Sequence, residues 1–116
     1  MAAEINYVDV NENFRRISLS GRLDILGTDS IELKFTSLSV ATNRRVVVDL
    51  TAISFLASIG IRALITNAKA LQQRGGKMVL FVGDNAAIAK TLETTGVDTL
   101  IPVVSDAVAA DNIALA

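Results

Sequence analysis

Two short runs of consecutive apolar residues most constrain what this chain can fold into. The first contains the β-branched residues Val46–Val48, and the second covers Met78–Val82. Continuous apolar runs of this length are typical of strands that are covered on both faces of a sheet. Between them, apolar residues recur at helical spacing, and Gly75-Gly76 ends that pattern as a helix C-cap would. The sequence therefore predicts two buried strands joined by a helix. The apolar residues of this helix are Ile61, Leu64, Ile65, Ala68 and Leu71.

The N-terminal part of the chain predicts a hairpin followed by a helix. Ile5–Val10 and Phe14–Leu19 have strand character, and the polar turn Asn11–Asn13 between them favours antiparallel pairing. Thr28–Ser30 offers the short oxygen-bearing side chains that are typical of a helix start. The residues expected to face the core from this helix are Ile31, Phe35 and Leu38.

The C-terminal part predicts a further helix, a short strand and a last helix. Asp84 is placed to cap a third helix that turns Ile88 and Leu92 inward and ends before Gly96. Leu100–Val104 is a strand candidate, and Pro102 either places that strand at the edge of the sheet or leaves the segment irregular. Ser105-Asp106 opens a C-terminal helix with one shared face, formed by Val108, Asn112 and Leu115.

This order of elements predicts a single α/β domain over residues 1–116. We expect a mixed β-sheet of four to five strands, opened by an antiparallel hairpin. Because the later strands alternate with helices, we expect about four helices mainly on one face of the sheet.

The composition excludes several classes of function. The chain has no Cys and no His, so it cannot form a disulfide, a thiol nucleophile, a Cys/His zinc site or a histidine relay. We expect no enzyme, no cofactor and no metal. The formal net charge of −1 and the low aromatic content of 4% argue against direct nucleic-acid binding. We expect no signal peptide, no membrane insertion and a cytoplasmic location.

The most informative segment follows the first buried strand, which is expected to end near Leu50. The next helix is expected to start near Ser58, with Gly60 in its first turn. Glycine there costs about 1 kcal/mol relative to alanine, which indicates a close approach to the sheet or to a partner. Ser58 has two interpretations at this stage: a helix N-cap, or a phosphorylation site whose phosphate would meet free N–H groups and the positive end of the helix.

Four segments, in order along nearly the whole chain, match the pattern of one family. They are Gly21–Asp24, Val47–Leu50 with Phe55–Ile61, Gly75–Leu80, and Leu92–Asp98. By these segments the chain resembles the STAS domain of bacterial anti-sigma-factor antagonists. The resemblance implies a partner-switching regulator that binds an anti-sigma factor, usually a serine kinase, and is released when that kinase phosphorylates it. A serine phosphatase would reset the switch.

By the same resemblance, the serine that accepts the phosphate is Ser58. The family usually has Asp-Ser-Ser-Gly or Asp-Ser-Thr-Gly at this point, whereas this chain has Ala57-Ser58-Ile59-Gly60. The loss of the acid at position 57 removes both an orienting group and a like charge beside the phosphate. The residues that we expect to bind the partner are Asp24, Phe55, Leu56, Ala57, Ser58, Ile59, Gly60 and Arg62.

Two other functions remain open from the sequence. The first is a non-switching STAS scaffold subunit of a stressosome-like or lipid-transport complex, in which Ser58 only caps a helix. The second is a nucleotide or other small-ligand binder that uses the helix start near Ser58 as an anion site. For the oligomeric state, the sequence allows a monomer or a weak homodimer.

Overall fold

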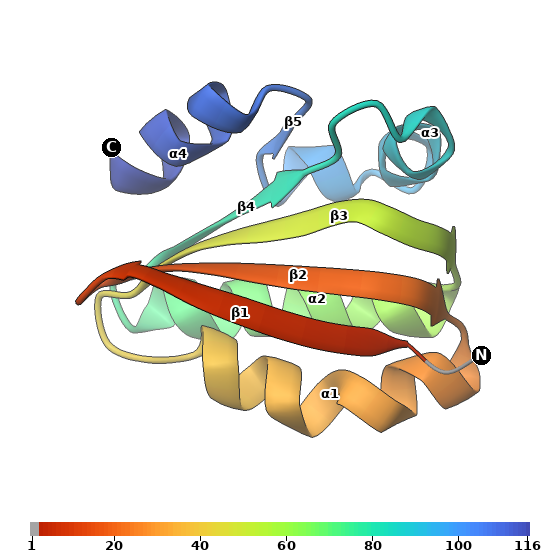
Figure 1. Cartoon of the computed structure of the whole chain (residues 1–116), viewed down its shortest axis with the longest axis horizontal. Helices are drawn as coiled ribbons and strands as arrows, with labels where there is room; N and C mark the ends of the chain where they lie inside the picture. Colours follow the sequence, from red (N-terminus) through yellow and green to blue (C-terminus); the bar gives the residue numbers. More distant parts are fainter. Residues whose placement is uncertain (1–2) are drawn as a thin grey trace.

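The computed structural model describes residues 3–116 as one mixed sheet with helices on both faces (Figure 1). Within this range the strands are β1 (Glu4–Asn11), β2 (Phe14–Leu23), β3 (Arg45–Leu56), β4 (Lys77–Phe81) and β5 (Val103–Val104). The helices are α1 (Ile25–Ser39), α2 (Ser58–Gln73), α3 (Ala86–Thr94) and α4 (Ala107–Leu115), with a 3-10 turn η1 at Val97–Thr99.

The order of strands in the sheet is the same as their order in the chain. β1 and β2 are antiparallel, and every later neighbouring pair is parallel. Parallel crossovers are right-handed, and all three run in the same direction across the sheet, so α1, α2 and α3 lie on one face. α4 follows the last strand and packs on the opposite face. This arrangement confirms the predicted α/β fold with its antiparallel hairpin.

The buried valines of β3 show why that strand has no polar alternation. Val46 and Val48 belong to the large core under α1, α2 and α3, whereas Val47 belongs to a smaller core under α4. Both faces of β3 are therefore covered, as the continuous apolar run predicts. The residues expected to face the core from α1, namely Ile31, Phe35 and Leu38, are also buried.

Two predicted boundaries are wrong at the end of the sheet that holds the site. β3 continues to Leu56 instead of ending near Leu50, because the second half of β2 pairs with it as far as Leu23. α1 begins at Ile25, before Thr28, because the Asp24 carboxylate accepts a hydrogen bond from the Gly27 N–H and caps the helix.

Two details of the C-terminal part also differ. The cap of α3 is Asn85 and not Asp84; its side-chain amide is held by the Ile53 carbonyl at 2.8 Å, while its oxygen accepts from Ile88 N–H. The buried residues of α4 are Ala110 and Ala114, and Val108 and Leu115 are exposed. Small residues let α4 approach the sheet closely. β5 lies at the edge of the sheet, as predicted, but it covers only Val103–Val104 of the expected Leu100–Val104 and begins after Pro102.

Candidate partner-binding surface at the start of helix α2

Two helix starts lie side by side at one end of the sheet. β2 and β3 are parallel neighbours, and their last registered pairs are Arg22 with Phe55 and Leu23 with Leu56. The Ala57 N–H then donates to the Leu23 carbonyl at 3.0 Å, just before α2 begins. The parallel register therefore brings the Asp24 turn next to the Ser58 turn, although the two are far apart in the sequence.

Ser58 is the first residue of α2 and is exposed. The N-cap position belongs to Ala57, whose extended backbone continues the direction of β3 and whose side chain offers no acceptor. The prediction that Ser58 caps the helix is therefore wrong. Because Ser58 is exposed in the first turn of α2, its hydroxyl is accessible to a group from solution.

Gly60 explains how α2 is seated against the sheet. A Cβ at this position would lie 2.8 Å from the Leu23 Cβ, 2.9 Å from the Leu56 Cδ1 and 3.0 Å from the Leu23 carbonyl oxygen. The close approach inferred from this glycine is therefore an approach to the chain's own sheet. Gly27 has the same role in α1, where a Cβ would lie 1.8 Å from the Arg22 carbonyl oxygen.

A charged and aromatic cluster borders these helix starts. The Arg22 guanidinium lies over the Phe55 ring, 4.4 Å from its centroid, and its Nε lies 3.4 Å from the Asp24 Oδ2. The hydrogen bond from Gly27 N–H, and after it the one from Arg22, hold the pKa of Asp24 below its ordinary value. Asp24 therefore presents a negative charge near Ser58 at neutral pH.

The predicted partner-binding residues are not equally accessible. Phe55, Ser58 and Arg62 are exposed, and Asp24, Ala57 and Ile59 are partly exposed. Leu56 and Gly60 are buried, so they support the surface from below and cannot form its outer layer.

Sequence reasoning missed three residues of this surface. Ile25 and Leu26, in the first turn of α1, are 70% and 81% exposed. Arg22 was also missed, because its contact with Phe55 depends on the parallel register and not on a local motif. The sequence signal for Ile25 and Leu26 is that two apolar residues directly follow Asp24. With a helix start expected at Thr28–Ser30, these two residues fall before the helix, so their place in its exposed first turn could not be predicted.

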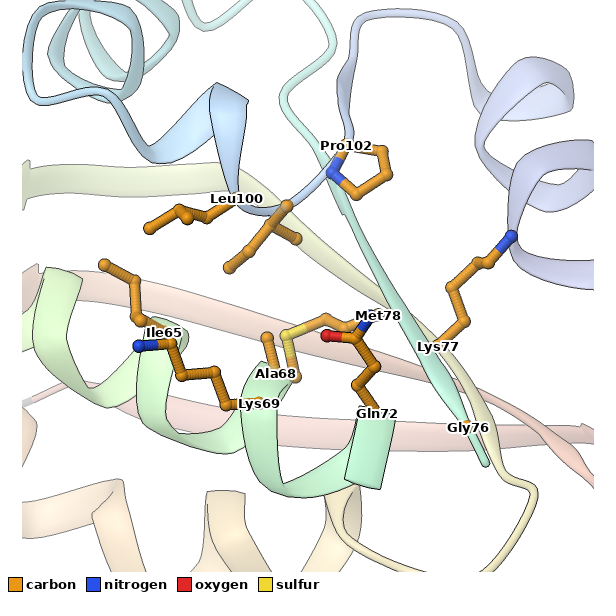
Figure 2. Close-up of a pocket in the computed structure, with 10 residues that line it drawn as sticks. Ile65, Ala68, Lys69, Gln72, Gly76, Lys77, Met78, Leu100 and Pro102 are labelled. Atoms are coloured by element: carbon orange, nitrogen blue, oxygen red, sulfur yellow. The ribbon is translucent and has the colours of Figure 1, made fainter. Parts of the chain in front are cut away.

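A pocket of about 280 Å³ lies elsewhere, between the second half of α2 and the segment before β5 (Figure 2). Its lining is mostly apolar and includes Ile65, Met78 and Leu100. The Lys77 ammonium points away toward α4, where it donates to the Ile113 carbonyl at 3.3 Å. None of the predicted site residues lines this pocket, so it is separate from the surface around Ser58.

Within residues 3–116, no group of three or more Asp and Glu side chains is placed to hold a metal ion. In the same part of the chain, no helix combines the length and the apolar character that crossing a membrane requires.

Among the comparisons with known proteins, a family model identifies the family, and solved structures show the fold. A family model described as the STAS domain matches residues 7–110. An anti-sigma factor antagonist from Mycobacterium paratuberculosis has a similar structure, with a TM-score of 0.83 and 22% identity over 99% of this chain and 96% of that chain. No curated protein sequence matches significantly.

Two structures of SpoIIAA are also similar. The anti-sigma factor antagonist SpoIIAA in its unphosphorylated form gives a TM-score of 0.72 with 18% identity, over 95% of this chain and 96% of that chain. The Bacillus cell fate determinant SpoIIAA in the phosphorylated form gives 0.66 with 18% identity, over 95% and 99%. At such identities the likeness establishes a shared fold.

Proposed function

Because the chain belongs to the STAS domain family, we propose that it is an anti-sigma-factor antagonist whose partner binding is switched by phosphorylation of Ser58. The observation that carries the proposal is the position of Ser58. It is exposed at the start of α2, a helix whose N-terminus has no side-chain cap, and exposed apolar side chains lie at the same end of the sheet. Solved structures similar to this one are described as anti-sigma factor antagonists, and one of them as a phosphorylated form.

The unphosphorylated surface suits binding to another protein. Phe55 is 41% exposed near the end of β3, and Ile25 and Leu26 are exposed in the first turn of α1, which follows the end of the neighbouring strand β2. Aromatic and aliphatic side chains of this kind provide the buried centre of an interface, and the Arg22–Asp24 pair provides a polar rim. The proposed partner is an anti-sigma factor of the serine-kinase type.

A phosphate on Ser58 would leave the fold in place and change the surface. At the first residue of α2, a charge of roughly −1.5 to −2 meets the positive end of the helix and its free N–H groups. The partner would then have to desolvate that charge next to the Asp24 carboxylate. Arg62, one turn along the same exposed side of α2, is placed to attract the phosphate. Binding is therefore lost without unfolding.

In this scheme the protein acts in the cytoplasm by contact and not by catalysis. It holds the anti-sigma factor, frees the sigma factor for transcription and makes no contact with DNA itself. The kinase activity belongs to the partner, and a serine phosphatase returns Ser58 to its unmodified form.

The experiment compares Ser58→Ala and Ser58→Asp with matched changes at Thr66, which is exposed further along α2. Each variant is incubated with a candidate anti-sigma kinase and ATP, and its intact mass and its affinity for the kinase are measured. We expect one phosphoryl group on the wild type and on Thr66→Ala, and none on Ser58→Ala. We expect Ser58→Asp to bind at least about tenfold more weakly, a loss of about 1.4 kcal/mol, and Thr66→Asp to bind like the wild type.

Equal binding by Ser58→Ala, Ser58→Asp and the wild type would contradict the switch. That result would favour the scaffold function, in which the same surface binds a partner permanently.

A further inference from the structure

The outer edge of β1 is open. Among residues 3–116, β1 pairs only with β2, so it ends the sheet on that side (Figure 1). A strand in this position presents unpaired backbone N–H and C=O groups on its outer edge, which are a template for a further strand. β1 is eight residues long, long enough for a substantial ladder.

β1 lacks two of the features that normally protect an edge strand, because its sequence, EINYVDVN, contains neither Lys nor Pro. Its one irregularity, a register shift against β2, lies between Asp9 and Asn11 near the C-terminal end of the strand and leaves Glu4–Asp9 in regular pairing. Tyr7 is 46% exposed, Val8 is 64% exposed and Val10 is 46% exposed. The opposite edge differs, because β5 has only two residues, follows Pro102 and leads directly into α4. Only one edge of the described sheet is therefore suited to accept a strand.

The sequence of β1 is complementary to itself in one antiparallel register. If Tyr7 of one copy faces Tyr7 of another, Asn6 faces Val8 and Ile5 faces Asp9. Glu4 then faces Val10, so no acidic residue faces another. Aromatic pairs and mixed apolar–polar pairs across strands are favourable, whereas facing like charges are not.

The one charge near the centre of this register is already paired. The Asp9 carboxylate accepts from the Arg15 Nε at 2.6 Å, and the Arg15 guanidinium lies over the Tyr7 ring at 4.6 Å from its centroid. Arg15 is itself anchored by the Leu38 carbonyl at 3.1 Å. A second strand would therefore meet a fixed, nearly neutral edge, on a chain whose net charge is only −1.

We propose that β1 is a homodimerisation strand, which pairs antiparallel with β1 of a second copy around a two-fold axis at Tyr7. The two sheets become one continuous sheet, and α1 of both copies lies on the same face. Such an interface is isologous, as in most closed dimers. Ser58 is in α2 and outside β1, so dimerisation and partner binding use different surfaces.

The test measures mass against concentration by sedimentation equilibrium. The wild type is expected to rise from 12.3 kDa toward twice that mass. Asn6→Lys/Val8→Lys places lysines opposite each other twice in the dimer, and both positions are exposed in the single copy. We expect this variant to associate at least about tenfold more weakly. Leu33→Lys/Val108→Lys adds the same charge at positions 87% and 66% exposed outside β1, and should dimerise like the wild type.

A charge-reversal experiment tests the register. Asn6→Glu/Val8→Glu should be weakened to a similar degree, and an equimolar mixture with the lysine variant should restore the dimer, because each lysine then faces a glutamate. Circular dichroism checks that every variant is folded. A wild type that stays at 12.3 kDa up to millimolar concentration would overturn the proposal. So would a lysine variant that dimerises as tightly as the wild type, or a mixture that stays monomeric.

Discussion

Gly60 couples the position of the exposed serine to the buried end of β2. A Cβ at this position would meet Leu23 and Leu56, both core residues, whereas Ser58, two residues earlier, is exposed to solvent. The place of the hydroxyl therefore depends on how tightly the first turn of α2 packs. An alanine at this position gains helix propensity of about 1 kcal/mol but has to displace atoms that are close to the backbone.

We expect Gly60→Ala to lower the free energy of unfolding by about 1–2 kcal/mol, because overpacking outweighs the gain in propensity. Urea denaturation measures this change. Thr66→Ala, at an exposed position of the same helix, is the control and should leave stability within about 0.5 kcal/mol. A Gly60→Ala protein more stable than the wild type would show that α2 can shift away from β2 freely.

At the scale of elements, α1 and α2 begin in different ways although they start side by side. α1 has a carboxylate cap at Asp24, whereas α2 has Ala57 at its cap and no side-chain acceptor. The start of α1 is thus fixed by a charged hydrogen bond. The start of α2 keeps its N–H groups available, which suits a site where a phosphate is to arrive.

The cap of α1 predicts a pH dependence. The pKa of Asp24 is lowered in the folded chain, chiefly by the Gly27 N–H, so its stabilisation is fully present above the unfolded pKa of about 4 and is lost as pH falls through the folded pKa. We expect Asp24→Asn to have a lower urea midpoint than the wild type at pH 7, with a smaller difference in strong acid. Asp29→Asn, an exposed carboxylate in the same helix, should show little change at either pH. A pH-independent difference would show that Asp24 acts without its charge.

Features of these elements that depend on local sequence periodicity could be predicted, and features that depend on pairing between distant strands could not. The core faces of α1 and α2 and the two buried strands follow from local periodicity, and they were predicted. The start of α2 near Ser58 was predicted as well, but the end of β3 was not, because β3 stays extended to Leu56 only through its pairing with β2. The Arg22–Phe55 contact needs the same register. Long-range pairing therefore decides the details of the surface, while local pattern decides the fold.

At the scale of the whole molecule, the two faces of the sheet are unequally covered. One core extends under α1, α2 and α3 and includes Phe35, Leu64 and Leu92. The other lies under α4 alone, which contributes the small side chains of Ala110 and Ala114. Since burial of apolar area is the main source of stability, the α4 layer contributes less than the other layer.

We expect amide hydrogen exchange to be faster in α4 than in β3, β4 and α2, because α4 opens locally while the central strands exchange through global unfolding. Leu80→Ala removes a fully buried side chain from the larger core, at a cost of about 2–5 kcal/mol. It should therefore speed exchange in β3 and β4 much more than in α4. Equal protection of α4 and β3 in the wild type would show that the two layers unfold as one.

The agreement between strand order and chain order has a consequence for how the protein is made. Each strand after β1 pairs with the strand that precedes it in the chain. During synthesis, which proceeds at about 5–20 residues per second, the hairpin of β1 and β2 can form first and each later strand can add to a sheet already present. No strand has to insert between two strands that were synthesised before it, so the growing sheet needs no rearrangement as the chain lengthens.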